Sequence, residues 1–157
     1  MLSIRAATIA DVSLLRRLIQ ELAEYEQESQ AVLITEDELR RDGFGSVPKF
    51  RAILAEQDGQ AAGFAFFFIC YSTWTGSALF LEDLFVRKEF RGYGVGKMLL
   101  AQLAEIAREE GLHTIKLDVL DWNESAIKFY KSLGGECLQQ WRSFQIGEQA
   151  LKRLGRR

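Results

Sequence analysis

The spacing of apolar positions predicts four helices. Leucine and isoleucine side chains recur every three or four residues between positions 14 and 22, behind a Thr8-x-x-Asp11 capping box. A second cap at Thr35, with three acidic residues after it, opens another helix, and glycines 43 and 111 fit helix ends. The predicted helices cover about residues 11–25, 35–43, from the end of the glycine-rich stretch at 92–96 to 111, and 124–133.

Apolar and aromatic runs between turn residues predict the strands. Gln57-Asp58-Gly59-Gln60 separates two such runs and predicts an antiparallel hairpin, to which a third strand is added as a meander. The expected strands are residues 2–7, 50–56, 61–71, 77–86, 114–120 and 138–146. The order βααβββαβαβ predicts one mixed α/β sheet with helices on its faces. With no linker or repeat dividing the chain, residues 1–157 are expected to form a single domain.

Composition and charge exclude several classes of protein. The 157 residues are 48% hydrophobic and 27% charged, as in a globular domain. Twenty Lys and Arg against 22 Asp and Glu give a net charge of -2, so nucleic-acid binding is not expected. The longest apolar run, 61–71, is shorter than the ~20 residues of a membrane-spanning helix. Cys70, Cys137 and the lone His113 suggest no metal site, and we expect a cytoplasmic protein.

The segment Arg91-Gly92-Tyr93-Gly94-Val95-Gly96-Lys97 lies between a predicted strand and a predicted helix. Glycines at alternate positions let successive N–H groups turn toward an anion, and the start of the helix adds its positive dipole end. The cations nearby are Arg87, Lys88, Arg91 and Lys97. Neither a Walker A loop nor a G-x-G-x-x-G fingerprint fits these positions. A diphosphate or a phosphorylated cofactor is the expected ligand.

Residues 91–96 resemble the Q/R-x-x-G-x-G/A acetyl-CoA motif of the GNAT N-acetyltransferase superfamily. Segments 4–11, 81–86 and 122–131 fit that superfamily in the same order. Within it, the chain is most similar to the spermidine/spermine (diamine) N-acetyltransferases, through segments 22–26, 42–45, 81–83 and 122–124. The resemblance implies a GNAT-like, mostly antiparallel sheet flanked by helices. Its strands should splay apart at the acetyl-CoA site, near Val86 and Thr114.

The resemblance also implies a role for each matching residue. Glu82 would be the catalytic base and Tyr130 the catalytic acid. Tyr25, Glu26, Glu82 and Asp83 would bind the amine. The backbone of Leu84, Phe85 and Val86 would hold the pantetheine arm, and residues 92–97 the diphosphate. The cofactor-binding residues implied are Leu84, Phe85, Val86, Arg91, Gly92, Tyr93, Gly94, Val95, Gly96, Lys97, Asn123 and Ala126. Asn123 could instead cap the following helix. The family habit is a homodimer.

The chemistry of acetyl transfer suits these residues. An alkylamine with a pKa near 10.4 is protonated at pH 7. Removing its proton costs roughly 4.6 kcal/mol, because the pKa lies about 3.4 units above the pH. A carboxylate base can accept this proton. From Leu18 to Leu39 there are seven acidic residues and no Lys or Arg, which favours a cationic acceptor. The expected function is therefore acetylation of a primary amine on a small di- or polyamine, or on a thialysine-like amine, by direct attack.

Two alternatives remain open at this point. The acidic stretch could equally receive a peptide N-terminus or a protein lysine, and a non-catalytic CoA-binding regulatory module could retain the glycine segment. Two positions depart from the diamine family: Gln139 stands where that family has an acidic residue, and Ala126 where it has a serine. Both departures weaken the inference about which amine is the acceptor.

Overall fold

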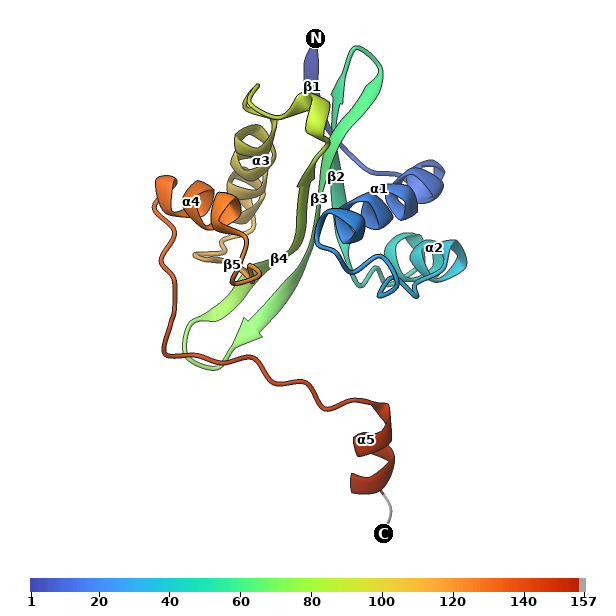
Figure 1. Cartoon of the computed structure of the whole chain (residues 1–157), viewed down its shortest axis with the longest axis vertical. Helices are drawn as coiled ribbons and strands as arrows, with labels where there is room; N and C mark the ends of the chain where they lie inside the picture. The colour runs from blue at the N-terminus through green and yellow to red at the C-terminus, as the bar shows by residue number, and fades with distance from the viewer. Residues whose placement is uncertain (156–157) are drawn as a thin grey trace. The chain divides into compact units, whose positions relative to one another are not determined.

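The computed structural model describes residues 1–155, which form two compact units, one of residues 1–118 and one that starts at residue 119. The elements of both are labelled in Figure 1. Each unit is described by itself below. The expectation of a single domain remains a prediction.

The first unit is a five-stranded sheet in the order β1-β2-β3-β4-β5. The strands are β1 (Leu2–Ala6), β2 (Arg51–Gln57), β3 (Gln60–Ser72), β4 (Gly76–Val86) and β5 (Ile115–Leu117). Neighbouring strands are antiparallel except for β4 and β5, which are parallel. This confirms the predicted α/β class with a mixed, mostly antiparallel sheet, although β5 is shorter than the predicted strand 114–120.

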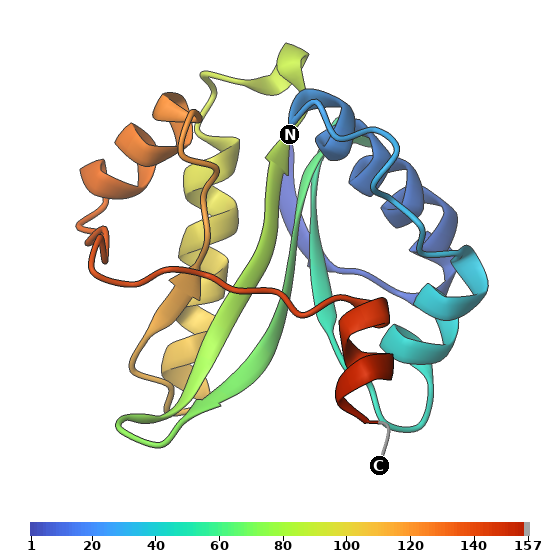
Figure 2. The ribbon, with the colours of Figure 1, turned by 60° about the horizontal axis from the view of Figure 1, so that its bottom comes forward.

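Helices lie on both faces of this sheet. The helices of the unit are η1 (Ile9–Asp11), α1 (Val12–Tyr25), α2 (Glu36–Phe44), η2 (Lys88–Phe90) and α3 (Val95–Glu109). Figure 2 shows α1 and α2 on one face and α3 on the other. Both predicted caps exist, at Thr8 and at Thr35, where the hydroxyl accepts from the N–H of Glu38 at 3.2 Å. The predicted hairpin also exists, and Asp58 and Gly59 both have the positive φ that a two-residue turn requires.

Burial on the two sides follows the helical periodicity. Leu15 and Leu18 of α1 pack in one cluster with Leu54 of β2 and Phe64 of β3, all four fully buried. On the other side, α3 buries Leu99, and with it Val95, Leu103 and Ala107. Because side chains pack closely against both faces of the sheet, the sheet is held rigidly. The ends of its strands therefore have defined positions.

Strand β4 changes register at one residue. Leu81 pairs with Phe67 and Asp83 with Phe66, so Glu82 is an extra residue in β4, as in a β-bulge. The pairing of β4 with β5 covers three residue pairs and ends at Leu81 with Leu117. Residues 82–86 therefore have β3 on one side and, within the described chain, no strand on the other. The predicted separation of the two strands beyond this point agrees with this pairing.

The second unit contains α4 (Glu124–Ser132) and α5 (Glu148–Leu154). The predicted strand 138–146 is wrong: residues 135–147 include neither helix nor strand. Alternation of apolar and polar side chains favours a strand only if a partner supplies hydrogen bonds to its backbone, and this segment has no paired strand within residues 1–155. No helix among the described residues is long and apolar enough to cross a membrane.

Candidate active site

Two glycines shape the connection between η2 and α3. Gly92 has φ 85° and Gly94 has φ 82°, the left-handed region that L side chains rarely adopt. A Cβ at either position would meet no atom within 4 Å, so the requirement for glycine comes from the backbone conformation. Gly94 is also the N-cap of α3, so the turn leads directly into the helix.

Six successive backbone N–H groups in this connection are free to bind a ligand. Those of residues 92–97 make no hydrogen bond within the part of the chain that the structure describes. Met98 is the first to donate into the helix, to the carbonyl of Gly94 at 3.0 Å. Unpaired donors at the positive end of a 15-residue helix form an anion site. The glycine-rich segment thus has the geometry expected from its sequence.

Four cationic side chains were expected near the glycine-rich segment. Two of them, Arg87 and Arg91, have partners within the protein. Arg87 binds Glu21 of α1 through two N–O contacts of 2.6 and 2.7 Å and donates to the carbonyl of Ala61. Arg91 donates from Nε to the carbonyl of Val86 at 2.8 Å, and its guanidinium carbon lies 4.5 Å from the centre of the Tyr25 ring. Lys88 and Lys97 are exposed and make no ion pair among the described residues.

These contacts border an open groove of about 430 Å³ beside the end of β4. The groove is lined by residues of α1, of the end of β4 and of the connection that follows β4. The lining residues are Glu21, Tyr25, Phe85, Arg87, Lys88, Glu89 and Arg91. Tyr25, predicted to bind the acceptor, and Arg91, predicted to bind the cofactor, therefore meet in one groove.

Two carboxylates, Glu82 and Glu26, act on the carboxyl group of Asp83 beside the β4 bulge. Burial and, to a smaller extent, the negative charges of Glu82 and Glu26 together raise the pKa of Asp83 to about 7 from its ordinary 3.8. Burial also raises the pKa of Glu26. Glu82 itself is exposed. The structure thus brings together three of the residues predicted to bind an amine, and this group of carboxylates favours a cation.

Residues 84–86 end β4 beside the point where β5 has stopped. Leu84, Phe85 and Val86 pair with Ala65, Phe64 and Gly63 of β3. On the side where β5 would continue, the described residues provide no partner strand. The backbone there can accept an extended ligand, as the sequence prediction requires.

The remaining predicted residues belong to the second unit. Tyr130 lies on α4, where burial raises the pKa of its phenol to about 12, and its ring packs edge-on against Phe129 with the centroids 5.2 Å apart. Asn123 Oδ1 accepts from the N–H of Ala126 at 3.2 Å. Asn123 is therefore a helix cap, one of the two roles that its position allowed.

Comparison with known proteins identifies the class of protein that this fold and site define. Residues 14–134 match the Acetyltransferase (GNAT) family, and the chain belongs to that family as an N-acetyltransferase. It is 40% identical to the thialysine N-epsilon-acetyltransferase of Sus scrofa, over 96% of this chain and 95% of that protein. It is 36% identical to the protein of the same name in Caenorhabditis elegans, over 87% and 86% of the two chains.

Solved structures confirm the fold. An integron cassette protein from V. cholerae superposes with a TM-score of 0.82 at 23% identity, over 99% of this chain and 98% of that one. An aminoglycoside acetyltransferase from a soil metagenomic sample gives 0.79 at 16%, over 94% and 96%. At these identities the likeness shows the architecture alone.

Sequence reasoning missed the contacts that bind α1 to the β4–α3 connection. Glu21 and Tyr25 are one turn apart on α1, and their partners Arg87 and Arg91 are also four residues apart. This matched spacing was a visible signal, but pairing the segments requires knowing that α1 crosses the end of β4. No group of three or more His, Cys, Asp or Glu side chains within residues 1–155 is placed to hold a metal ion.

Proposed function

We propose that this enzyme transfers an acetyl group from acetyl-CoA to a primary amine of a small diamine or polyamine, or to a thialysine-like amine. The observation that carries the proposal is the grouping of Glu26, Glu82 and Asp83 in the same unit as six unpaired N–H donors. The carboxylates attract an ammonium group and the N–H donors attract an anion. The 40% identity to a thialysine N-epsilon-acetyltransferase supports the choice of acceptor.

The residues present fit acetyl-CoA. The N–H groups of residues 92–97, together with exposed Lys97, would hold its diphosphate, and the open side of residues 84–86 would hold the pantetheine arm. Asn123 and Ala126 are proposed to lie beside the cofactor. When bound, acetyl-CoA supplies an acyl thioester that a neutral amine can attack directly.

The carboxylates would bind the amine as a cation and then help it to lose a proton. Deprotonating an alkylammonium at pH 7 costs roughly 4.6 kcal/mol, and a carboxylate that receives the proton during attack offsets part of this cost. We assign that role to Glu82, directly or through a water molecule, and assign binding of the ammonium to Tyr25, Glu26 and Asp83. Tyr130 is assigned as the acid: with a pKa of about 12 its hydroxyl keeps its proton at neutral pH and can donate it to the departing sulfur.

We also propose that the enzyme is a cytoplasmic homodimer. Large apolar side chains in the second unit support an interface: Phe144 is 93% exposed and Leu154 72%. Light scattering after gel filtration tests the dimer. A single species with the mass of one chain at micromolar concentration would contradict it.

The acceptor is tested with a panel of amines. Spermidine, thialysine, lysine, free amino acids and lysine-containing peptides are each incubated with acetyl-CoA, and released thiol is measured. The proposal expects the highest kcat/KM for a small di- or polyamine or for thialysine. A clear preference for peptides would replace it with the protein-acetylation alternative, and acetyl-CoA binding without thiol release on any amine would indicate a regulatory module.

The role of Glu82 as base is tested by Glu82→Gln across pH. We expect about a 10²-fold loss of kcat, largest at low pH, where the amine is hardest to deprotonate. Glu109→Gln removes an exposed carboxylate from α3 and serves as the matched control. A loss of equal size at every pH would argue against a base role.

A further inference from the structure

The connection between α1 and α2, residues 27–35, begins with a strained residue. Gln27 has φ 63°, in the left-handed region that few residues other than glycine adopt. It follows Glu26, the C-cap of α1, and the next N–H, that of Glu28, donates back to the carbonyl of Ala23 at 2.8 Å. This is the hydrogen bond of a Schellman motif, in which the left-handed position is usually glycine.

Two side chains of α1 hold the rest of this connection through its backbone carbonyls. Arg16 Nε donates to the carbonyl of Ile34 at 2.8 Å, and Arg16 Nη2 donates to that of Val32 at 3.4 Å. Gln20 Nε2 donates to the carbonyl of Ser29 at 2.9 Å, and Gln20 Oε1 accepts from Arg16 Nη1 at 3.2 Å. The two α1 residues therefore hold the connection together.

Few apolar contacts support the same segment. Val32 and Ile34 are half-buried, and the other seven residues of the connection are exposed. Ile34 packs against buried side chains near α2, so packing holds the far end of the connection. A left-handed residue other than glycine persists only where its surroundings hold it there. The hydrogen bonds from Arg16 and Gln20 are the contacts best placed to keep Gln27 left-handed.

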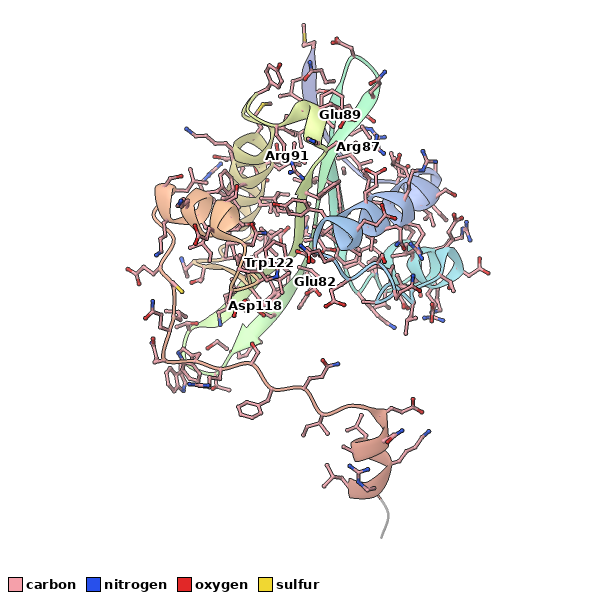
Figure 3. All side chains as sticks on the ribbon, viewed as in Figure 1. Glu82, Arg87, Glu89, Arg91, Asp118 and Trp122 are labelled. Atoms are coloured by element: carbon pink, nitrogen blue, oxygen red, sulfur yellow. The ribbon has the colours of Figure 1, made fainter. Side chains whose placement is uncertain are left out.

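The turn matters to the site because Glu26 directly precedes it. Glu26 is half-buried, and its negative charge acts on Asp83 of β4. Helix α1 contacts β4, and Figure 3 labels Glu82 on that strand near the C-terminal end of the helix. If Gln27 relaxed to a negative φ, the Schellman hydrogen bond would break and the last turn of α1 would lose its cap. Glu26 would then be free to change its backbone conformation.

We propose that Arg16 is a positioning residue for the amine, acting on Glu26 through the left-handed turn at Gln27. Arg16 holds the carbonyls of the connection, the connection keeps the turn, and the turn keeps Glu26 in place before the amine arrives. A carboxylate that is already in place binds a cation without the cost of being ordered at that moment. The inference rests on the proposed function, which assigns Glu26 to the ammonium group.

The first test compares Arg16→Ala with Arg17→Ala. Arg17 is exposed and makes no hydrogen bond or ion pair among the described residues, so its loss removes the same charge from the same helix without the contacts. Arg16→Ala should raise the KM of the amine that the panel selects about three- to tenfold, and change kcat and the Kd of acetyl-CoA less than twofold. Arg17→Ala should leave all three within twofold. An unchanged amine KM in Arg16→Ala would overturn the proposal.

Substitutions at Gln27 test the turn itself. Glycine adopts a positive φ without strain, so adding Gln27→Gly to Arg16→Ala should return the amine KM to within about twofold of the wild type. Gln27→Val places a β-branched side chain there and should raise the amine KM as Arg16→Ala does, although Arg16 is present. It therefore carries the test even where Arg16→Ala fails to fold. A double variant as impaired as Arg16→Ala would contradict the proposal.

Hydrogen exchange follows the turn without any amine. The N–H of Glu28 reaches the carbonyl of Ala23 only while Gln27 is left-handed, so its exchange rate reports the state of the turn. We expect this amide to exchange at least fivefold faster in Arg16→Ala than in the wild type or Arg17→Ala. Equal rates would overturn the proposal even if the amine KM had risen. Failure of the wild type to acetylate any amine would instead refute the proposed function, and the exchange measurement does not depend on turnover.

Discussion

Asp83 combines partial burial with two acidic neighbours, which makes its ionisation costly in the folded protein. Its pKa is about 7 in the fold against 3.8 ordinarily, so the unfolded chain loses this proton first as pH rises. The free energy of unfolding therefore falls progressively from about pH 4 to pH 7 through this group and stays low above that range. A bound ammonium would reverse part of this effect, because it stabilises the ionised form.

Asp83→Asn should raise the free energy of unfolding at pH 8 by about 1–3 kcal/mol and leave it nearly unchanged at pH 4. The amide carries no charge at either pH. Urea denaturation at pH 4, 6 and 8 measures the effect, with Asp121→Asn, an exposed aspartate of the second unit, as control. Asp83→Asn should also bind the amine more weakly than the wild type does. Stabilisation of equal size at every pH would show that Asp83 does not titrate in this range.

Tyr130 is protonated over the whole working range of the enzyme because burial raises the pKa of its phenol to about 12. Tyr130→Phe keeps the ring and its packing on Phe129 but removes the hydroxyl. We expect kcat to fall by about 10²–10⁴-fold with acetyl-CoA binding nearly intact. Stopped-assay kinetics and calorimetry measure both quantities, and unchanged turnover would remove Tyr130 from the mechanism.

At the scale of elements, the start of α1 depends on a small polar network. Asp11 accepts from both guanidinium N–H₂ groups of Arg5 at 2.8 Å and from the N–H and hydroxyl of Thr8 at 2.7 and 2.9 Å. These contacts hold the pKa of Asp11 well below its usual range. They join β1 to the helix that carries Tyr25 at its other end.

Asp11→Ala should lower the free energy of unfolding by about 2–4 kcal/mol at pH 7, because it leaves the partly buried Arg5 with one fewer partner and removes the cap. The stabilising contribution of Asp11 is present above its unfolded pKa of 3.8 and is lost as pH falls below it. The difference from the wild type should therefore shrink below about pH 3. Thermal melts at pH 7 and pH 2 check this, and a difference that grows on acidification would contradict the interpretation.

The elements that were predictable from the sequence are those fixed by local signals. The caps at Thr8 and Thr35, the Asp58–Gly59 turn and the helical spacing of leucines placed α1, α2, α3 and the hairpin to within a few residues. The strand at 138–146 failed because strand formation depends on a distant partner, which no local pattern reports. The extra residue Glu82 in β4 also could not be foreseen, since a bulge is defined by register between two strands.

At the scale of the whole molecule, the sheet has one weak junction. Strands β3 and β4 pair over ten residue pairs, whereas β4 and β5 pair over three. Fewer ladder hydrogen bonds and less packing lower the free energy of local opening. The edge next to the proposed cofactor site should therefore open before the rest of the sheet.

Native-state hydrogen exchange tests this expectation. The Leu79 amide, which donates to the carbonyl of Thr114 at 3.0 Å, should exchange at least tenfold faster than the slowest amides of β3. Added CoA should slow it if the cofactor occupies this junction. Equal protection across all strands would mean that β5 belongs to the same cooperative unit as the rest of the sheet.

Candidate residues of the site could be named from the sequence, but the contacts between them could not be predicted. The unpaired N–H groups were expected from three alternate glycines at the start of a helix, whereas the binding of a cationic acceptor near the acidic stretch stays a prediction. The contact of Arg91 with Tyr25 joins residues 66 positions apart, and only the crossing of α1 over the end of β4 brings them together. The cofactor-binding role expected for Arg91 stays a prediction, and its contact with Tyr25 could not be foreseen from the sequence.

The positive φ angles of Gly92 and Gly94 also bear on how this sequence can change over time. Any replacement at these two positions adds a Cβ and strains the turn, with asparagine the least costly, whereas Tyr93 between them is 72% exposed. Descendants of a common ancestor should therefore keep glycine at the first and third of these neighbouring sites and diverge freely at the middle one. The alternation of conserved and variable positions in related sequences would then reflect the backbone conformation of this turn.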